Sequence, residues 1–265
     1  MAENAILLEV AFDGTDYYGW QIQPDKPTVQ NVVQTTLNKL YANQYFKLQG
    51  SSRTDAGVHA MGMAASFLPP NKPSISIKQL KIALNSLLPK DIRIIEATKV
   101  DPEFNARFFA KAKAYTYLIN TGEQLPFSNN YAWHQHHCSN IDAMNEAAKF
   151  LIGTNDFSSF TVQRSQIDSA VRTIFDIRFQ QFGRYLCITY IGDGFLYKMI
   201  RCLTGALVAV GTNRMTPKQL KQLLDAKDRG KGQVTAPPNG LFLMKVFFED
   251  NDWKNFTLSA PPFTF

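Results

Sequence analysis

Apolar residues recur at two different spacings along this chain. Alternation at every second position predicts strands, because successive side chains of a strand point to opposite faces of a sheet. Apolar positions three or four residues apart predict helices that bury one side. The predicted strands cover residues 6–12, 45–49, 91–97, 109–120, 172–182 and 185–191, with another ending at 68 and a last one starting at 240. The predicted helices open near residues 28, 76, 139, 194 and 216.

Polar residues at the starts of these helices can satisfy free backbone N–H groups. Ser76 and Thr216 each precede a glutamine by three residues, which predicts a capping box. Ser139 precedes Asp142 by the same spacing and predicts a third one. Thr28 is expected to act as a simple N-cap.

The helix that opens at Gly194 has an apolar stripe with one arginine away from it. The stripe consists of Phe195, Met199, Cys202, Leu203, Ala206 and Val210. Arg201 falls on the other side of the helical wheel, which favours a solvated arginine. Because a catalytic cleft is also exposed to water, this position does not exclude a role in a site.

The periodic pattern breaks near Asp101-Pro102, which indicates a boundary. We expect an N-terminal half, residues 1–104, and a C-terminal half, residues 105–265, that completes an active-site cleft. Strands and helices follow one another in a similar order in both halves, as expected of a duplicated unit. No clear internal repeat and no low-complexity segment is visible.

Composition narrows the class of protein. The 265 residues are 45% hydrophobic, enough for a full core, which argues against disorder. A net charge of +6 and a pI near 9.1 suit a polyanionic partner such as RNA, or a merely basic soluble protein. The three cysteines show no C-x-x-C spacing, which fits a reducing cytoplasmic compartment better than a disulfide scaffold. We expect no signal peptide and no membrane span.

The most informative stretch is the loop Gly50–Ala60, between two predicted strands. It holds small and hydroxylic residues with one arginine, Arg53, and one acid, Asp55. Asp55 could simply close an Asx-turn. A scaffold of strands can also fix such an acid while the loop exposes it, which suits catalysis.

The residue sequence of this loop is specific to one family of proteins. Residues 53–59, RTDAGVH, resemble the signature of the TruA family of tRNA pseudouridine synthases, whose Asp is the catalytic nucleophile. Three further segments resemble family motifs in the family order: residues 12–21 (FDGTDYYGWQ), 113–117 (KAYTY) and 195–201 (FLYKMIR). Lys198 and Ala114 depart from the usual residues, which puts peripheral RNA contacts in doubt more than the chemistry.

The resemblance implies an α+β fold with a mixed, mostly antiparallel sheet in two similar halves, helices behind it and a central RNA-binding cleft. It implies conversion of uridine to pseudouridine at positions 38, 39 and 40 of the tRNA anticodon stem-loop, by a cytoplasmic homodimer without a cofactor. Asp55 is then the nucleophile, attacking C6 or C1′, and Arg201 is its ion-pair partner. Tyr115 contacts the target uracil, Arg53 fills the space left by the flipped base, and Leu241 lines the pocket.

Other interpretations are weaker. His134 and His136 are expected on one face of a strand, but no second pair of ligands lies nearby, so we expect no metal site and a surface role near RNA for them and His137. The fragment Gly192-Asp193-Gly194 lacks the remaining glycine of a dinucleotide loop. A non-catalytic RNA-binding protein on the same scaffold is the main alternative.

Overall fold

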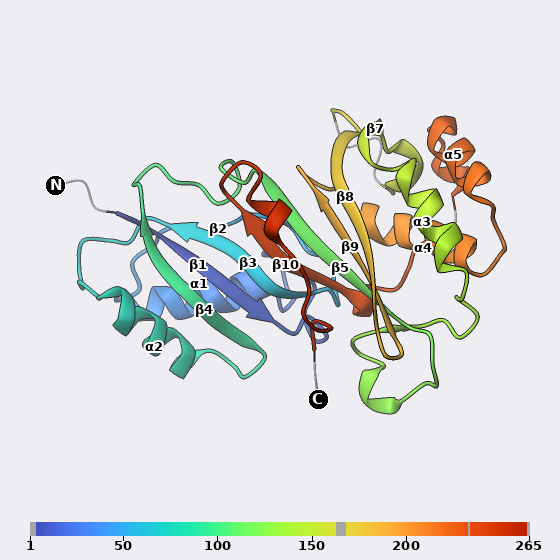
Figure 1. Cartoon of the computed structure of the whole chain (residues 1–265). Coiled ribbons are helices and arrows are strands. Elements are labelled where there is room, and N and C mark those ends of the chain that lie inside the picture. The colour runs from blue at the N-terminus through green and yellow to red at the C-terminus, as the bar shows by residue number, and fades with distance from the viewer. Residues whose placement is uncertain (1–3, 163–167, 233, 264–265) are drawn as a thin grey trace. The chain divides into compact units, whose positions relative to one another are not determined.

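The computed structural model describes residues 4–162, 168–232 and 234–263 (Figure 1). Its internal contacts divide the chain into two compact units. The first unit comprises Met1–Lys111 with Phe242–Asp250, and the second comprises Ala112–Leu241 with Asn251–Phe265. Each unit therefore consists of two stretches of the chain that are separated in sequence by part of the other unit.

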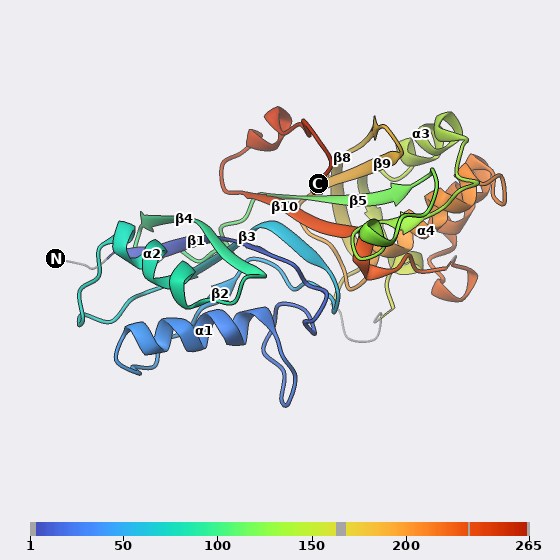
Figure 2. The ribbon, with the colours of Figure 1, turned by 90° about the horizontal axis from the view of Figure 1, so that it is seen from below.

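The first unit contains a sheet and two helices. Its strands are ordered β4 (Ile92–Val100), β1 (Ala5–Phe12), β3 (His59–Phe67) and β10 (Leu241–Phe247), with the short β2 (Gln49–Gly50) also paired to β3. The pairs of β1 with β3 and β4 are antiparallel, whereas β10 runs parallel to β3. Helix α1 (Val29–Leu40) runs along one face of these strands, and α2 (Ile77–Leu87) packs on β4 (Figure 2).

The second unit repeats the combination of sheet and helices. Its antiparallel strands are ordered β5 (Ala112–Asn120), β9 (Tyr185–Gly192), β8 (Val171–Phe182) and β7 (Gly153–Asp156), and β6 (Trp133–His134) pairs with β5. Helices α3 (Ile141–Lys149), α4 (Met199–Gly211) and α5 (Pro217–Ala226) contact one another. Short 3-10 helices occur at Pro126–Ser128, Ser158–Phe160, Arg229–Lys231, Pro238–Gly240 and Asp252–Asn255.

The predicted α+β class with a mostly antiparallel sheet is confirmed, with five α-helices among the described residues. The capping boxes at Ser76 and Thr216 are both present, each with reciprocal hydrogen bonds to its glutamine. The division at residues 104 and 105, and a cleft between the halves, stay predictions.

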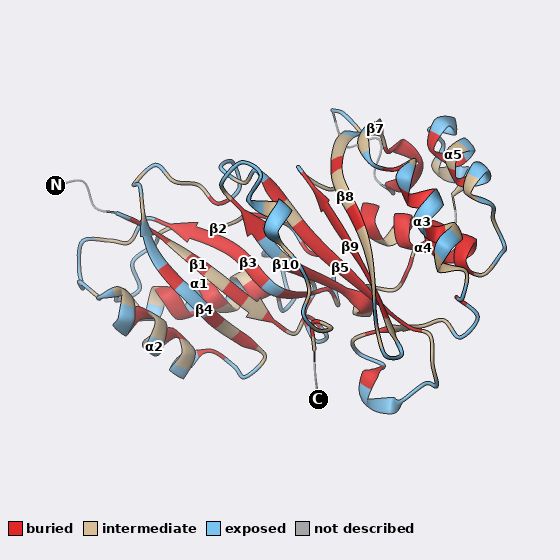
Figure 3. Ribbon diagram, in the orientation of Figure 1, coloured by how far each residue is buried: buried red, intermediate tan, exposed pale blue. Residues whose placement is uncertain are grey.

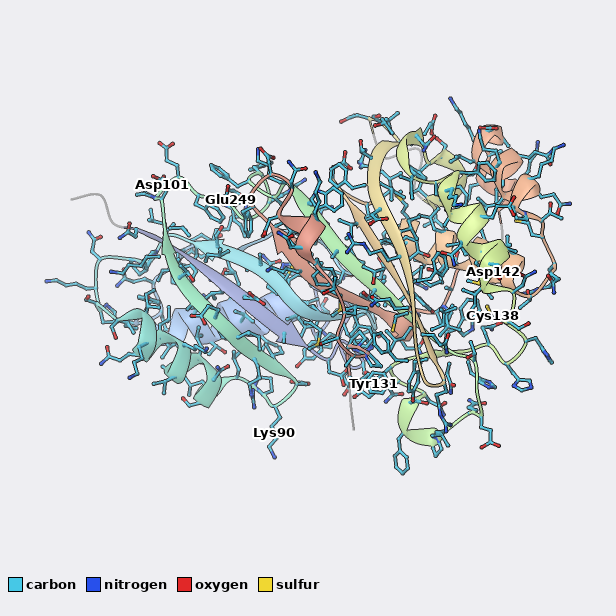
Figure 4. All side chains as sticks on the ribbon, viewed as in Figure 1. Lys90, Asp101, Tyr131, Cys138, Asp142 and Glu249 are labelled. Carbon is cyan, nitrogen blue, oxygen red and sulfur yellow. The ribbon has the colours of Figure 1, made fainter. Side chains whose placement is uncertain are left out.

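Three local predictions were wrong. Residues 45–48 are not a strand, and only Gln49–Gly50 pairs with β3. Asn140, not Ser139, caps α3, because its side-chain carbonyl accepts a hydrogen bond from the Ala143 N–H. Asparagine is as good an N-cap residue as serine. In Figure 4 the labelled Cys138 precedes this helix and the labelled Asp142 is its second residue. The hydroxyl of Thr28 makes no capping bond, although α1 begins directly after it.

Helix α4 also differs from its prediction. It starts at Met199, because Lys198 has a left-handed backbone with φ of 58°. All of its residues except Arg201 are buried, so the helix has no solvated side and no narrow stripe (Figure 3). A helix that is apolar all round is a core helix. The half-buried Arg201 is therefore the exception within α4.

Candidate functional site

Asp55 lies in the loop that connects β2 to β3 in the first unit. Its side chain is half-buried, and its carbonyl oxygen accepts a hydrogen bond from the Val58 N–H at 3.2 Å. This bond closes a turn in which Gly57 adopts a φ of +76°, a conformation that costs glycine nothing. The loop thus presents the acid from a fixed turn at the start of a core strand.

A second loop, residues 13–20, contacts the backbone of the Asp55 loop and braces it. The Gly57 N–H donates to the carbonyl of Tyr17 at 3.1 Å. Gly19 has φ of +85°, and a Cβ added there would lie 2.2 Å from the Thr54 carbonyl oxygen. The two backbones are therefore in direct contact at Gly19, immediately beside Asp55.

His59, which begins β3, ties the two loops together at a second point. The Gly14 N–H donates to His59 Nδ1 at 3.1 Å, and Asp13 Oδ1 lies 3.1 Å from the same nitrogen. Because one ring nitrogen either accepts or donates, only one of these contacts is a hydrogen bond at a time. The buried His59 ring also stacks on Phe242 of β10, with centroids 4.7 Å apart.

The aromatic residues of the bracing loop are mainly packing residues. Trp20 is buried and stacks on Phe12 at 6.1 Å. Tyr17 is buried and donates its hydroxyl proton to Asp91 Oδ2 at 3.0 Å; burial, with the hydrogen bond to Asp91, raises the pKa of its phenol. Tyr18 is 47% exposed, with the Lys26 ammonium 4.7 Å from its ring centroid. Tyr18 alone of these three rings is therefore available to an outside partner.

Arg201 holds a connecting segment of the second unit. Its Nε donates to the Ala236 carbonyl at 2.7 Å, while the Ala236 N–H donates to the Arg201 carbonyl at 3.0 Å. The next residue, Pro237, accepts a bond of 2.7 Å from the hydroxyl of buried Tyr117. Burial raises the pKa of Tyr117 well above its usual value, and the positive charge of Arg201 opposes that rise. This segment leads directly into Leu241, the first residue of β10.

Tyr115 lies on β5, opposite Tyr190 of β9, and is buried. Its ring meets Phe195 edge-to-face, with centroids 5.4 Å apart and planes at 83°. Phe195 was expected in a helical stripe, but it precedes α4 and packs on Tyr115 instead. Leu241 is also buried. The second unit thus contains a pair of packed aromatic rings, Tyr115 and Phe195, and a half-buried arginine, Arg201.

The predicted site residues fall into two groups. Asp55 and the exposed Arg53 share one loop of the first unit. Tyr115, Arg201 and Leu241 belong to the second unit. Sequence reasoning missed the bracing role of residues 13–20, although the glycines there signal a close backbone approach.

The histidines do not share a strand. His134 ends the two-residue β6, so the prediction of one strand that carries both His134 and His136 was wrong, although their ring centroids lie 6.4 Å apart. A ring nitrogen of His134 lies 2.9 Å from the Gly122 carbonyl, and the rings of His136 and His137 are 5.0 Å apart. Across the described ranges, no three metal-ligating side chains are grouped. Among the helices that the structure describes, none is long and apolar enough to cross a membrane.

Comparison with known proteins shows the family to which this chain belongs. The family model described as tRNA pseudouridine synthase matches residues 9–108 and 147–249. The tRNA pseudouridine synthase A of Thermoanaerobacter sp. (strain X514) is 40% identical over 244 residues, covering 92% of this chain and 99% of that protein. The enzyme of the same name from Thermosipho melanesiensis is 40% identical over 91% of this chain and 98% of its own.

A solved structure, the archaeal box H/ACA sRNP Nop10-Cbf5 complex, aligns with 76% of this chain and 42% of its own at 13% identity and a TM-score of 0.34, too low to support an argument. The sequence relatives and the family model suffice. The chain belongs to the tRNA pseudouridine synthase family. It is accordingly an enzyme of the isomerase class.

Proposed function

We propose that this enzyme converts uridine to pseudouridine at positions 38, 39 and 40 of the tRNA anticodon stem-loop, with Asp55 as nucleophile. The observation that supports Asp55 most strongly is its loop, where the backbone of a half-buried acid is held by a closed turn and by close contact with Gly19. A nucleophile must be aimed as well as present, and a fixed turn supplies that aim.

The proposed reaction breaks the bond from C1′ to N1 and forms one from C1′ to C5. N1 then takes up a proton and C5 loses one, so no electrons are gained or lost and no redox partner is required. Asp55 attaches to C6 or to C1′ in the first step and is released in the last. Both routes need an ionised carboxylate and a base that has been turned out of its stack.

The remaining predicted residues divide this work. Arg201 pairs with the Asp55 carboxylate and holds it in position for attack. Tyr115 contacts the extruded uracil, with Phe195 fixing the tilt of its ring. Leu241 lines the apolar side of the pocket. Exposed Arg53 enters the space that the base leaves.

Mapping of modified bases tests this proposal. Unmodified tRNA incubated with the protein should gain pseudouridine at positions 38 to 40 and nowhere else, without any added cofactor. The map is read by sequencing after a pseudouridine-selective adduct, with heat-inactivated protein as the control. Binding of tRNA without any new pseudouridine would instead support an RNA-binding protein that lacks the chemistry.

We also infer that the enzyme works as a homodimer in the cytoplasm. Ile82 and Leu87 on α2 and Ile95 on β4 are exposed apolar residues of the kind that a second copy covers. All three cysteines are free and buried, as suits a reducing compartment. Sedimentation at micromolar concentration should give a mass of about twice 29.9 kDa. A fully active monomer would contradict the homodimer.

A further inference from the structure

The segment Phe104–Lys111 of the first unit exposes aromatic and basic side chains together. Phe108 is 74% exposed and Phe109 is 48% exposed. The exposed Arg107 places its guanidinium carbon 5.5 Å from the centroid of the Phe108 ring. Two neighbouring phenylalanines at such exposure are unusual, because an apolar ring in water is normally covered.

This segment is fixed by hydrogen bonds around Asn105. Its carbonyl accepts the N–H groups of Phe108 at 3.1 Å and Phe109 at 3.0 Å, and its Oδ1 accepts the Arg107 N–H at 2.9 Å. Its Nδ2 donates to Gln49 Oε1 on β2 at 2.6 Å. The exposed ring therefore stands on an ordered turn and is not at the tip of a loose loop, so that a partner would find it already in place.

Two further contacts hold the turn to the sheet. The Ala106 N–H donates to the hydroxyl of buried Ser66 on β3 at 2.9 Å. Phe104 packs on both Phe109 and Phe248, with centroids 5.1 Å away in each case. Phe109 is thus partly used in packing, whereas Phe108 and Arg107 are directed outward.

The position of this turn relative to Asp55 follows from β3. Ser66 lies near the end of that strand, and His59, which follows the Asp55 loop, lies at its start. Seven residues of strand at about 3.3 Å each place the two points about 23 Å apart. A single nucleotide does not span that length, whereas a folded RNA does.

We propose that Arg107 and Phe108 form a second RNA contact on the first unit, away from the reacting base. Phe108 stacks on an unpaired base of the same tRNA, and Arg107 pairs with the adjoining phosphate. An aromatic ring beside a guanidinium is the combination that binds single-stranded nucleotides, and the net charge of +6 favours a polyanion over an acidic or neutral protein surface. The inference rests on the proposed action on tRNA.

Binding and catalysis separate this contact from the active site. Phe108→Ala should weaken the affinity for full-length tRNA about 5- to 150-fold, since stacking on one base contributes that much. The rate of pseudouridine formation in a single turnover at saturating enzyme should stay unchanged. Phe108→Trp should retain near-normal affinity, because it keeps a stacking face. Arg107→Ala should lower the slope of log affinity against log salt by about one.

Phe127→Ala is the matched control, since Phe127 is 77% exposed but lies in the second unit. It should bind tRNA as the unaltered enzyme does. Unchanged affinity in Phe108→Ala rejects RNA as the occupant and leaves the surface to a protein partner. Loss of affinity that Phe108→Trp fails to restore also overturns stacking. If the unaltered enzyme binds tRNA but forms no pseudouridine, the proposed reaction fails while the affinity comparison still decides this contact.

Discussion

Asp55→Asn is expected to abolish pseudouridine formation while leaving tRNA binding largely intact. The amide keeps the shape and polarity of the side chain but cannot act as an anionic nucleophile. Its turn is closed by backbone atoms, from the Val58 N–H to the Asp55 carbonyl, so the loop should keep its conformation. Because loss of a nucleophile typically costs about 10⁴-fold or more in rate, product should fall below detection in a single turnover.

Excess enzyme in that assay ensures that weak binding cannot be mistaken for lost chemistry. Asp16→Asn, an exposed acid of the bracing loop, is the control and should retain near-normal activity. Substantial product from Asp55→Asn would remove Asp55 as the nucleophile. Equal losses in both variants would point to a general disturbance of the two loops.

Gly19→Ala should strongly destabilise the first unit. Alanine at φ of +85° costs about 1–2 kcal/mol in strain. Its Cβ would also lie 2.2 Å from the Thr54 carbonyl and 3.0 Å from the Asp55 carbonyl carbon, so backbone must move. Overpacking of this kind adds about 1–3 kcal/mol. The movement displaces the Asp55 loop, and the catalytic rate should fall more than the affinity for tRNA.

Gly183→Ala supplies the comparison. Gly183 also has positive φ, +56°, but a Cβ added there meets nothing within 4 Å. Its cost should therefore be strain alone, about 1–2 kcal/mol, with an unchanged rate. Denaturant melts give the two free energies of unfolding, and single-turnover assays give the rates. Equal destabilisation with equal activity would mean that Gly19 does not brace the Asp55 loop.

Local signals in the sequence predicted the capping boxes at Ser76 and Thr216 correctly, but not the caps expected at Ser139 and Thr28. The prediction of the capping box at Thr216 was confirmed because its partner, Gln219, lies within one turn of the helix. Predictions failed where tertiary packing decides. Nothing in the periodicity of residues 194–211 shows that α4 is enclosed on all sides, nor that Phe195 leaves the helix to pack on Tyr115.

In the candidate site, too, local features could be predicted from the sequence and long-range contacts could not. The composition of the Asp55 loop and its motif single out the acid as a candidate from the sequence alone. The brace at Gly19 and Gly14 joins segments about 40 residues apart, and the Arg201 bond to Ala236 spans 35 residues. Such contacts have no local signature, since any glycine between polar residues is equally consistent with an ordinary turn.

The return of β10 to the first unit has a consequence for synthesis of the protein. The sheet of that unit gains its last strand only from residues 242–247, and the buried ring of His59 has no stacking partner until Phe242 has been made. A ribosome that has finished the first 111 residues has therefore made the Asp55 loop without the neighbour that completes its support. Chains that terminate before residue 242 lack this strand, so the His59 ring beside the Asp55 loop is left without its stacking partner.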